Sequence, residues 1–125
     1  DPIWLRTSGK EKGRDGCRVP IPWTEKDAYP NFKGLSAENQ EEDAESMLNF
    51  YRKALWLRRD LCTDEFFEFI KSDKDVISFK RSGGWQVIAN FGTKAVDLPA
   101  GKVAISSAQI ANNQLPANAT AWVIN

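Results

Sequence analysis

The sequence contains no histidine, and this absence excludes several kinds of active site. Without an imidazole, the chain by itself cannot build a Ser-His-Asp or Cys-His nucleophile system. Its two cysteines, Cys17 and Cys62, lie far apart and lack the paired spacing of zinc ligands. We therefore predict no metal site and no cofactor. Two free, buried thiols are the favoured interpretation and fit a reducing compartment, while a disulfide is the less favoured alternative.

Surplus charge and long apolar runs are also missing. The 17 Lys+Arg residues balance the 17 Asp+Glu residues, whereas nucleic-acid-binding domains usually carry a basic surplus. No run approaches the roughly 18 apolar residues of a membrane span. We expect no nucleic-acid partner and no membrane partner. The 125 residues, 42% of them hydrophobic, match about one domain that can fold without disulfides or metals.

Residues 1–35 are predicted to be irregular and extended. Four of the six prolines lie here, and Pro20 and Pro22 prevent a helix across 19–23. The segment is nevertheless too apolar for a free linker, because its large apolar residues include Ile3, Trp4, Val19, Ile21, Trp23, Tyr29 and Phe32. We expect it to pack against another surface.

One strong helix is predicted over residues 43–60. Asp43 is the expected N-cap, and Arg58 and Arg59 place positive charge at the far end, where the helix dipole favours it. Apolar residues at i, i+3, i+4 and i+7 form a wide stripe that needs a broad partner surface. Ser36 is predicted to cap a short helical turn before this helix. The acidic run 38–45 is interpreted as a solvated helix entry rather than a partner-binding patch.

The second half of the chain is predicted to form short strands, with a hairpin at Ser82-Gly83-Gly84, where glycines accept a positive φ. The pattern favours an antiparallel β-sandwich with strands near 65–70, 76–81, 85–91, 95–98, 102–107 and 120–125. Phe66, Phe67 and Phe69 are interpreted as core aromatics rather than a sugar-stacking face. Trp85 and Trp122 are expected in the core or at an interface.

The segment 13–23 carries the candidate chemistry. Arg14 and Arg18 flank Asp15, glycines allow a tight turn, and prolines then extend the chain into Trp23. An arginine offers a planar fork of donors for carboxylates or adjacent hydroxyls, which is the chemistry of a sugar site. The alternative, favoured by composition alone, is an Arg–Asp turn that only fixes the loop.

These residues resemble the segment after the last barrel strand in the α-glucosidase branch of glycoside hydrolase family 13, where the pattern is roughly Arg-Asp-x-x-Arg-[Val/Thr]-Pro-x-x-Trp. The first residues, Asp1-Pro2-Ile3-Trp4, are similar to bacterial, actinobacterial-type members. Residues 46–59 resemble the family's final barrel helix. The family's small C-terminal β domain is similar to four further segments of this chain, at residues 76–79, 84–91, 98–101 and 115–123.

The resemblance implies an α+β fragment. Residues 1–62 would be the end of a (β/α)8 catalytic barrel, comprising the strand-eight loop and the last helix. Residues 63–125 would be a small antiparallel β-sandwich C-terminal domain. The family's catalytic carboxylates lie on earlier barrel strands, so no catalytic residue is expected in this chain, and the chain alone is expected to be inactive.

The implied reaction is retaining hydrolysis of terminal α-linked glucose from maltose- or isomaltose-type oligosaccharides, with two carboxylates about 5–5.5 Å apart. Arg14 matches the arginine that binds the non-reducing-end glucose, Arg18 is the second candidate, and Asp15 would orient an arginine. Trp23 is interpreted as packing. The implied partners are an α-glucoside oligosaccharide and the missing barrel, and the implied location is the cytoplasm.

The stretch Thr24–Leu35 departs from the family, because it is shorter and lacks the Gly-Phe and Pro-Trp or Leu-Pro motifs that border the leaving-group sites. The resemblance therefore does not define substrate preference. Within the family, a transglycosylase or isomerase acting on sucrose or trehalose is an alternative. Outside it, a non-enzymatic β-sandwich module that binds sugars or a protein would show an exposed aromatic row. A small protein that pairs with a second copy is a third possibility.

Overall fold

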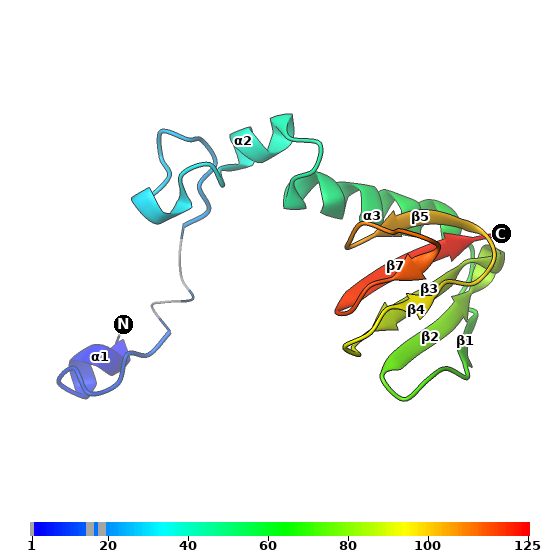
Figure 1. Cartoon of the computed structure of the whole chain (residues 1–125). Coiled ribbons are helices and arrows are strands. Elements are labelled where there is room, and N and C mark those ends of the chain that lie inside the picture. The colour runs from blue at the N-terminus through cyan, green and yellow to red at the C-terminus, as the bar shows by residue number, and fades with distance from the viewer. Residues whose placement is uncertain (1, 15–16, 18–19) are drawn as a thin grey trace. The chain divides into compact units, whose positions relative to one another are not determined.

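The structure is a computed structural model that describes residues 2–14, 17 and 20–125. The chain divides into two compact units, residues 1–50 and 51–125, and the boundary falls within a helix. Figure 1 shows the elements in chain order: α1 (Pro2–Arg6), η2 (Pro30–Phe32), α2 (Ala37–Glu42), α3 (Met47–Leu61), β1 (Phe67–Ile70), β2 (Val76–Arg81), η3 (Ser82–Gly84), β3 (Gln86–Asn90), β4 (Val96–Asp97), β5 (Lys102–Ser106), β6 (Gln114–Leu115) and β7 (Ala119–Ile124).

The first unit begins with a helix, so the expectation of an irregular start is wrong at residues 2–6. Pro2 favours this outcome, because its fixed φ suits the first turn of a helix and its missing N–H costs no hydrogen bond there. Beyond α1, the Thr7 hydroxyl donates to the Ile3 carbonyl at 2.7 Å. Gly9, at φ +82°, donates its N–H to the Trp4 carbonyl at 2.9 Å and ends the turn.

Two serines cap the next helices. Ser36 caps α2 as predicted, since its side chain accepts a hydrogen bond from the Asn39 N–H. The predicted cap of the long helix is wrong: Ser46, not Asp43, precedes α3, and its hydroxyl accepts from the Asn49 N–H at 3.2 Å. Asp43 instead ends α2, and its carboxylate accepts from the Glu45 N–H at 2.9 Å in the turn between the helices. An aspartate can bond the backbone two residues on as readily as it caps a helix.

The second unit contains a five-stranded antiparallel sheet with the order β1-β2-β3-β7-β5 and a separate two-stranded sheet, β4-β6. The strands expected at 76–81, 102–107 and 120–125 are confirmed within one residue at their ends, and the strand expected at 85–91 is confirmed as Gln86–Asn90. The hairpin signal is also confirmed, because Gly83 and Gly84 have φ values of +77° and +79°. The pair Gln114–Leu115 was not expected as a strand, since two residues are too few to show alternation.

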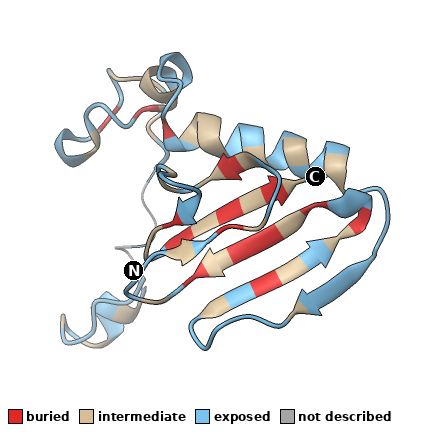
Figure 2. Cartoon of the chain, turned by 45° about the vertical axis from the view of Figure 1, so that its right-hand side comes forward, coloured by how far each residue is buried: buried red, intermediate tan, exposed pale blue. Residues whose placement is uncertain are grey.

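The main core lies between the two sheets. It consists of Ile88, Ala119, Ala121 and Val123 from the large sheet, together with Leu98 and Leu115 from the β4-β6 layer. Figure 2 shows the buried residues concentrated along the central strands, while β1 is exposed. The central strands are buried because each is flanked by hydrogen-bonded neighbours and covered by the second layer.

The opposite face of the large sheet carries one apolar row across all five strands. Register pairs Phe69 with Phe79, Phe79 with Val87, Val87 with Trp122, and Trp122 with Ile105. Val87 is 7% exposed, whereas Phe69 is 71% exposed. The side chains of this row are therefore buried at the centre of the sheet and exposed to solvent at the β1 edge.

Two expectations about aromatic residues have different outcomes. Trp85 is buried and its ring lies 4.9 Å from that of Trp122, which confirms a core position for Trp85. Phe66, Phe67 and Phe69 are exposed, so their assignment to the core is wrong. The alternation of the strand is real, but β1 is an edge strand and its apolar face stays largely exposed, with the Arg81 guanidinium 5.9 Å from the centre of the Phe67 ring.

Candidate functional site

Two residues, Arg14 and Arg18, are proposed for substrate binding and Asp15 as their support, and of these the structure describes only Arg14. Asp15 and Arg18 lie outside the described residues. Gly13, with φ +58°, makes the tight turn that the sequence predicts, and Arg14 follows it as an exposed residue whose carbonyl accepts from the Cys17 N–H at 3.0 Å. The described residues thus present Arg14 at the surface of the first unit.

The backbone that follows the arginine segment is held by α2. The Pro22 carbonyl accepts from the Ala37 N–H at 2.9 Å, and the Trp23 carbonyl accepts from the Glu38 N–H at 3.1 Å. These are the N–H groups at the start of α2, which have no partner inside the helix. The indole of Trp23 is nevertheless 67% exposed. The backbone of Trp23 is therefore held in place by hydrogen bonds, whereas its side chain is exposed to solvent.

Glu25 joins the two ends of the same loop. Its carboxylate accepts from the Gly34 N–H and from the Asn39 side-chain amide, each at 3.1 Å. Its carbonyl accepts from the Lys33 ammonium at 2.6 Å, and its N–H donates to the Glu38 carboxylate at 3.1 Å. Residues 22–39 thus form a loop braced by its own hydrogen bonds, although the sequence predicted only an irregular segment here.

Several large apolar side chains of α1, of the segment 13–23 and of this loop are not covered by the described chain. The exposed fractions are 79% for Leu5, 64% for Ile21 and 55% for Leu35. Loops of soluble domains rarely present several large apolar groups without a partner. The sequence-based expectation that this segment packs against a surface is therefore not met within the first unit.

The long helix has a second bare surface. In the second unit, Tyr51, Leu55 and Trp56 are 60%, 60% and 59% exposed. Ala54, Leu57 and Leu61, on the other side, are partly buried. The helix therefore has an inner apolar side, which lies along the sheet (Figure 2), and an outer apolar side that is more than half exposed. We call Tyr51, Leu55 and Trp56 the outer face of α3.

The end of α3 is tied to the turn after β2. The N–H groups of Thr63 and Asp64 donate to the Ser82 hydroxyl at 3.1 and 3.2 Å. The Arg81 guanidinium donates to the sulfur of Cys62 over 2.8 Å. Both cysteines are free, but the expectation that both are buried is wrong, because Cys62 is half-buried and Cys17 is exposed in the arginine segment.

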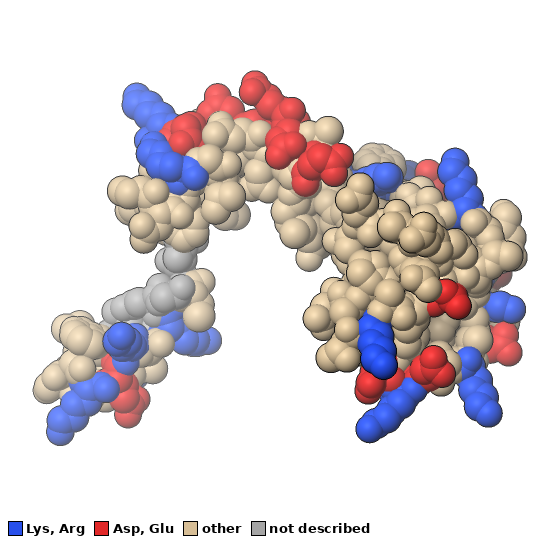
Figure 3. Space-filling view, viewed as in Figure 1, with Lys and Arg blue, Asp and Glu red and all other residues tan. Residues whose placement is uncertain are grey.

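Acidic side chains are concentrated around α2 in the first unit. Figure 3 shows acidic side chains gathered over the α2 segment, where Glu38, Glu41, Glu42, Asp43 and Glu45 are exposed. Their exposure agrees with a solvated helix entry. Across the described residues, no group of three or more Asp, Glu or Cys side chains could hold a metal ion. Every helix in the described part of the chain is too short or too polar to span a bilayer.

Three curated glucosidases are similar to this chain in sequence, although no family model matches it. The oligo-1,6-glucosidase of Halalkalibacterium halodurans is 25% identical over 111 residues, which cover 74% of this chain and 20% of that protein. The α-glucosidase of Candida albicans is 29% identical over 92 residues, covering 61% and 16%. An α-glucosidase of Saccharomyces cerevisiae is 29% identical over 97 residues, covering 53% and 17%.

The chain spans about a fifth of the length of the curated relatives that it matches. Their similarity supports a relationship to glycoside hydrolase family 13. A solved Salmonella typhimurium chain assigned as an α-amylase aligns with 97% of this chain and 23% of its own length, at 14% identity and a TM-score of 0.48. That score is too low to establish a shared fold.

Proposed function

We propose that these 125 residues are the C-terminal portion of a retaining α-glucosidase of the bacterial, actinobacterial type, acting in the cytoplasm on maltose- or isomaltose-type oligosaccharides. Residues 1–62 would end the catalytic barrel, and residues 63–125 would form its C-terminal β domain. The observation that carries the proposal is the sequence similarity to α-glucosidases and an oligo-1,6-glucosidase, confined to about a fifth of their length.

The uncovered apolar surface supports the same proposal. A preceding barrel would bury the exposed side chains of Leu5, Ile21, Trp23 and Leu35 and the outer face of α3. Each large apolar side chain stabilises a protein by about 1.5–3 kcal/mol when it is fully removed from water. Such a surface is costly for a free-standing domain and ordinary for a segment that packs against a larger body.

In the proposed enzyme, the chemistry is divided between this chain and the barrel. The barrel would supply the nucleophilic carboxylate and the acid/base carboxylate, about 5–5.5 Å apart. Arg14 would bind adjacent hydroxyls of the terminal glucose through its guanidinium fork, with Arg18 as a second donor. Asp15 would hold one of the two arginines in place. This division explains how a chain without histidine can belong to a sugar-cleaving enzyme.

The test compares two conservative variants of the longer polypeptide that carries these residues. Arg14→Lys keeps the charge but removes the paired donors, so we expect kcat/KM for maltose or isomaltose to fall by about ten- to a hundredfold. Arg6→Lys, at another exposed arginine of the first unit, is the matched control and should leave kcat/KM unchanged. Equal kcat/KM values for both variants would contradict the role of Arg14. Absence of any α-glucosidase activity in the unaltered polypeptide would contradict the proposed function itself.

One observation favours a second candidate, a β domain that binds sugars without cleaving them. Phe67, Phe69 and Phe79 form a cluster with ring centroids 4.8–6.4 Å apart at the bare edge of the large sheet. Exposed aromatic rings offer stacking surfaces to the C–H faces of sugars. Glycan binding by the isolated chain that is lost in Phe69→Ala, but kept in Ile77→Ala on the same face, would support this candidate.

A further inference from the structure

The strand β1 forms one edge of the large sheet. It stands at the end of the strand order β1-β2-β3-β7-β5, and Figure 2 shows it as an exposed strand at the border of the sheet. The backbone N–H and C=O groups along such an edge can form hydrogen bonds with a strand of another chain. A second polypeptide could therefore extend the large sheet at β1.

Two phenylalanines direct their backbone groups toward this edge. The Arg81 N–H donates to the carbonyl just before β3 at 2.9 Å, so the backbone groups of Arg81 face β3. Bonding directions alternate along a strand, so those of Lys80 face β1, where the register partner of Lys80 is Glu68. Phe67 and Phe69 flank Glu68, and their N–H and C=O groups therefore point away from β2, toward the free edge.

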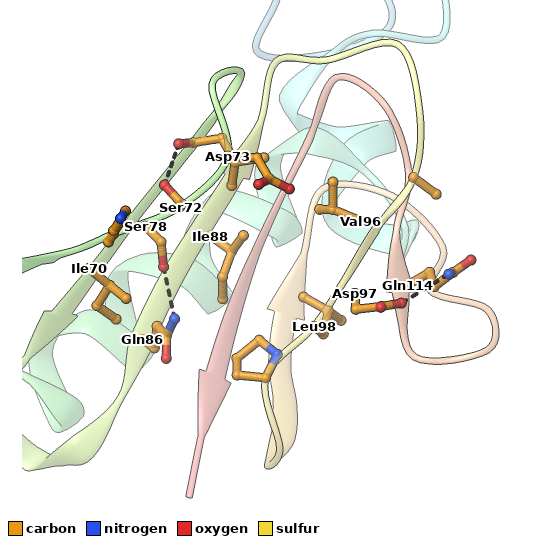
Figure 4. Close-up of a pocket in the computed structure, with 14 residues that line it drawn as sticks. Ile70, Ser72, Asp73, Ser78, Gln86, Ile88, Val96, Asp97, Leu98 and Gln114 are labelled. Carbon is orange, nitrogen blue, oxygen red and sulfur yellow. Dashed lines mark hydrogen bonds between the residues drawn. The ribbon is translucent and has the colours of Figure 1, made fainter.

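The side chains of the same two phenylalanines lie on the exposed face of β1. Ile70 pairs with Ser78, and Ser78 pairs with Ile88. Figure 4 shows these three side chains on the face that lines the pocket between the two sheets. Successive side chains of a strand alternate between its faces, so Phe67 and Phe69 lie on the opposite face, where they are 45% and 71% exposed.

We propose that β1 pairs antiparallel with β1 of a second copy of this chain, around a two-fold axis at Glu68. The axis stands perpendicular to the sheet, so each face continues from one copy into the other. In this register, Phe67 of each copy lies opposite Phe69 of the other, which gives two aromatic cross-strand pairs. On the other face, the two Glu68 side chains meet at the axis, and their register partners, the two Lys80 side chains, offset the like charges.

The charges next to β1 favour a second copy as the partner, and they favour this register. Glu65 and Lys71 are exposed and lie two positions before Phe67 and two positions after Phe69. The proposed register brings Glu65 of each copy opposite Lys71 of the other, which gives two opposite-charge pairs. The two nearest registers that keep the same face lose both pairs, because they bring Glu65 opposite Phe69 or opposite Asp73 of the second copy. The edge is thus complementary to itself.

The expected association is weak. The strand β1 has four residues, so the pairing buries less surface than the roughly 1,200–2,000 Å² of a standard interface. We expect a dimer Kd of about 10–500 µM for the 125-residue chain. The pairing uses only the second unit and does not rest on the proposed hydrolysis.

The test is sedimentation equilibrium of the 125-residue chain from about 10 µM to 1 mM, a range that brackets the expected Kd. Lys71→Glu turns both attractive pairs into repulsive ones and should raise the Kd about five- to a hundredfold. Adding Glu65→Lys exchanges the two charges and should restore the Kd to within about threefold. Lys102→Glu is the matched control, since Lys102 is exposed on β5 at the other edge of the same sheet, and it should leave the Kd unchanged. Circular dichroism reports that each variant is folded.

Three results would overturn the proposal. The first is a chain that stays monomeric at about 1 mM, in which case glycan binding lost in Phe69→Ala would assign the exposed edge to sugars. The second is a dimer whose Kd does not respond to Lys71→Glu, which would place the association on another surface. The third is a loss in Lys71→Glu that Glu65→Lys does not restore, which would exclude this register.

The proposed pairing and the proposed hydrolysis can fail separately. A longer polypeptide that hydrolyses α-glucosides, with a 125-residue chain that stays monomeric, would refute the pairing alone. A 125-residue chain that dimerises as expected, within a longer polypeptide without α-glucosidase activity, would refute the hydrolysis alone.

Discussion

Replacing Leu55 by alanine removes a side chain that is 60% exposed on the outer face of α3. Full burial of a leucine side chain stabilises a protein by about 1.5–3 kcal/mol. About two fifths of the Leu55 side chain is buried, so its contribution is about 0.6–1.2 kcal/mol. The same substitution at Leu115, which is 0% exposed in the core between the sheets, also leaves a cavity and should cost about 2–5 kcal/mol. In the isolated chain, Leu115→Ala should therefore lower the free energy of unfolding several times more than Leu55→Ala does.

Urea denaturation followed by circular dichroism measures both values on the same chain. If a barrel covers α3 in a longer polypeptide, the cost of Leu55→Ala should rise there toward that of Leu115→Ala. A loss of more than about 2 kcal/mol for Leu55→Ala in the isolated chain would refute the reasoning, because it would mean that the outer face is already buried. An equally small cost in the longer polypeptide would show that no barrel packs on this helix.

Three further substitutions test parts of the fold by denaturation. Asn90→Ala removes a buried amide that donates to three backbone carbonyls, among them that of Leu115 at 3.3 Å, and we expect a loss of about 2–4 kcal/mol; a loss below about 0.5 kcal/mol would contradict this role. Gly101→Ala places a Cβ 2.6 Å from the Ile124 carbonyl oxygen at φ +138°, so we expect about 1–3 kcal/mol of destabilisation, and an unchanged midpoint would disprove the clash. Ser36→Ala removes the α2 cap and should cost about 0.5–2 kcal/mol, whereas Ser36→Asp should retain more of the helical signal.

The sequence predicted the strands of the second unit well, because their patterns depend on local alternation and on turns that need glycine. Val76–Arg81 alternates over six residues and is followed by Gly83 and Gly84, so both the strand and its turn can be identified without tertiary information. The two-residue strand Gln114–Leu115 could not be found this way, since its existence depends on pairing with β4.

Burial was harder to predict than secondary structure. Phe67 and Phe69 carry the apolar signal of core residues, but their exposure depends on their place at the edge of the sheet, which no local pattern encodes. The loop of residues 22–39 was missed for a related reason. Glu25 braces it through Gly34 and Asn39, which are nine and fourteen positions away, and such contacts leave no periodic trace in a sequence.

Only those residues of the candidate site that belong to a recognisable sequence motif could be predicted. Arg14 was found because two arginines flank an aspartate beside prolines and a tryptophan, and the structure presents Arg14 as an exposed residue. Asp15 and Arg18 lie outside the described residues, so their roles stay predictions.

The most direct test of the central claim is the stereochemistry of hydrolysis. The 125-residue chain and the proposed longer polypeptide are each mixed with an aryl α-glucoside, whose leaving group is not a sugar, and proton NMR identifies the anomer of glucose that forms first. We expect no hydrolysis by the 125-residue chain and initial release of α-glucose by the longer polypeptide, as retention requires. Hydrolysis by the 125-residue chain alone, or initial release of β-glucose, would contradict the account.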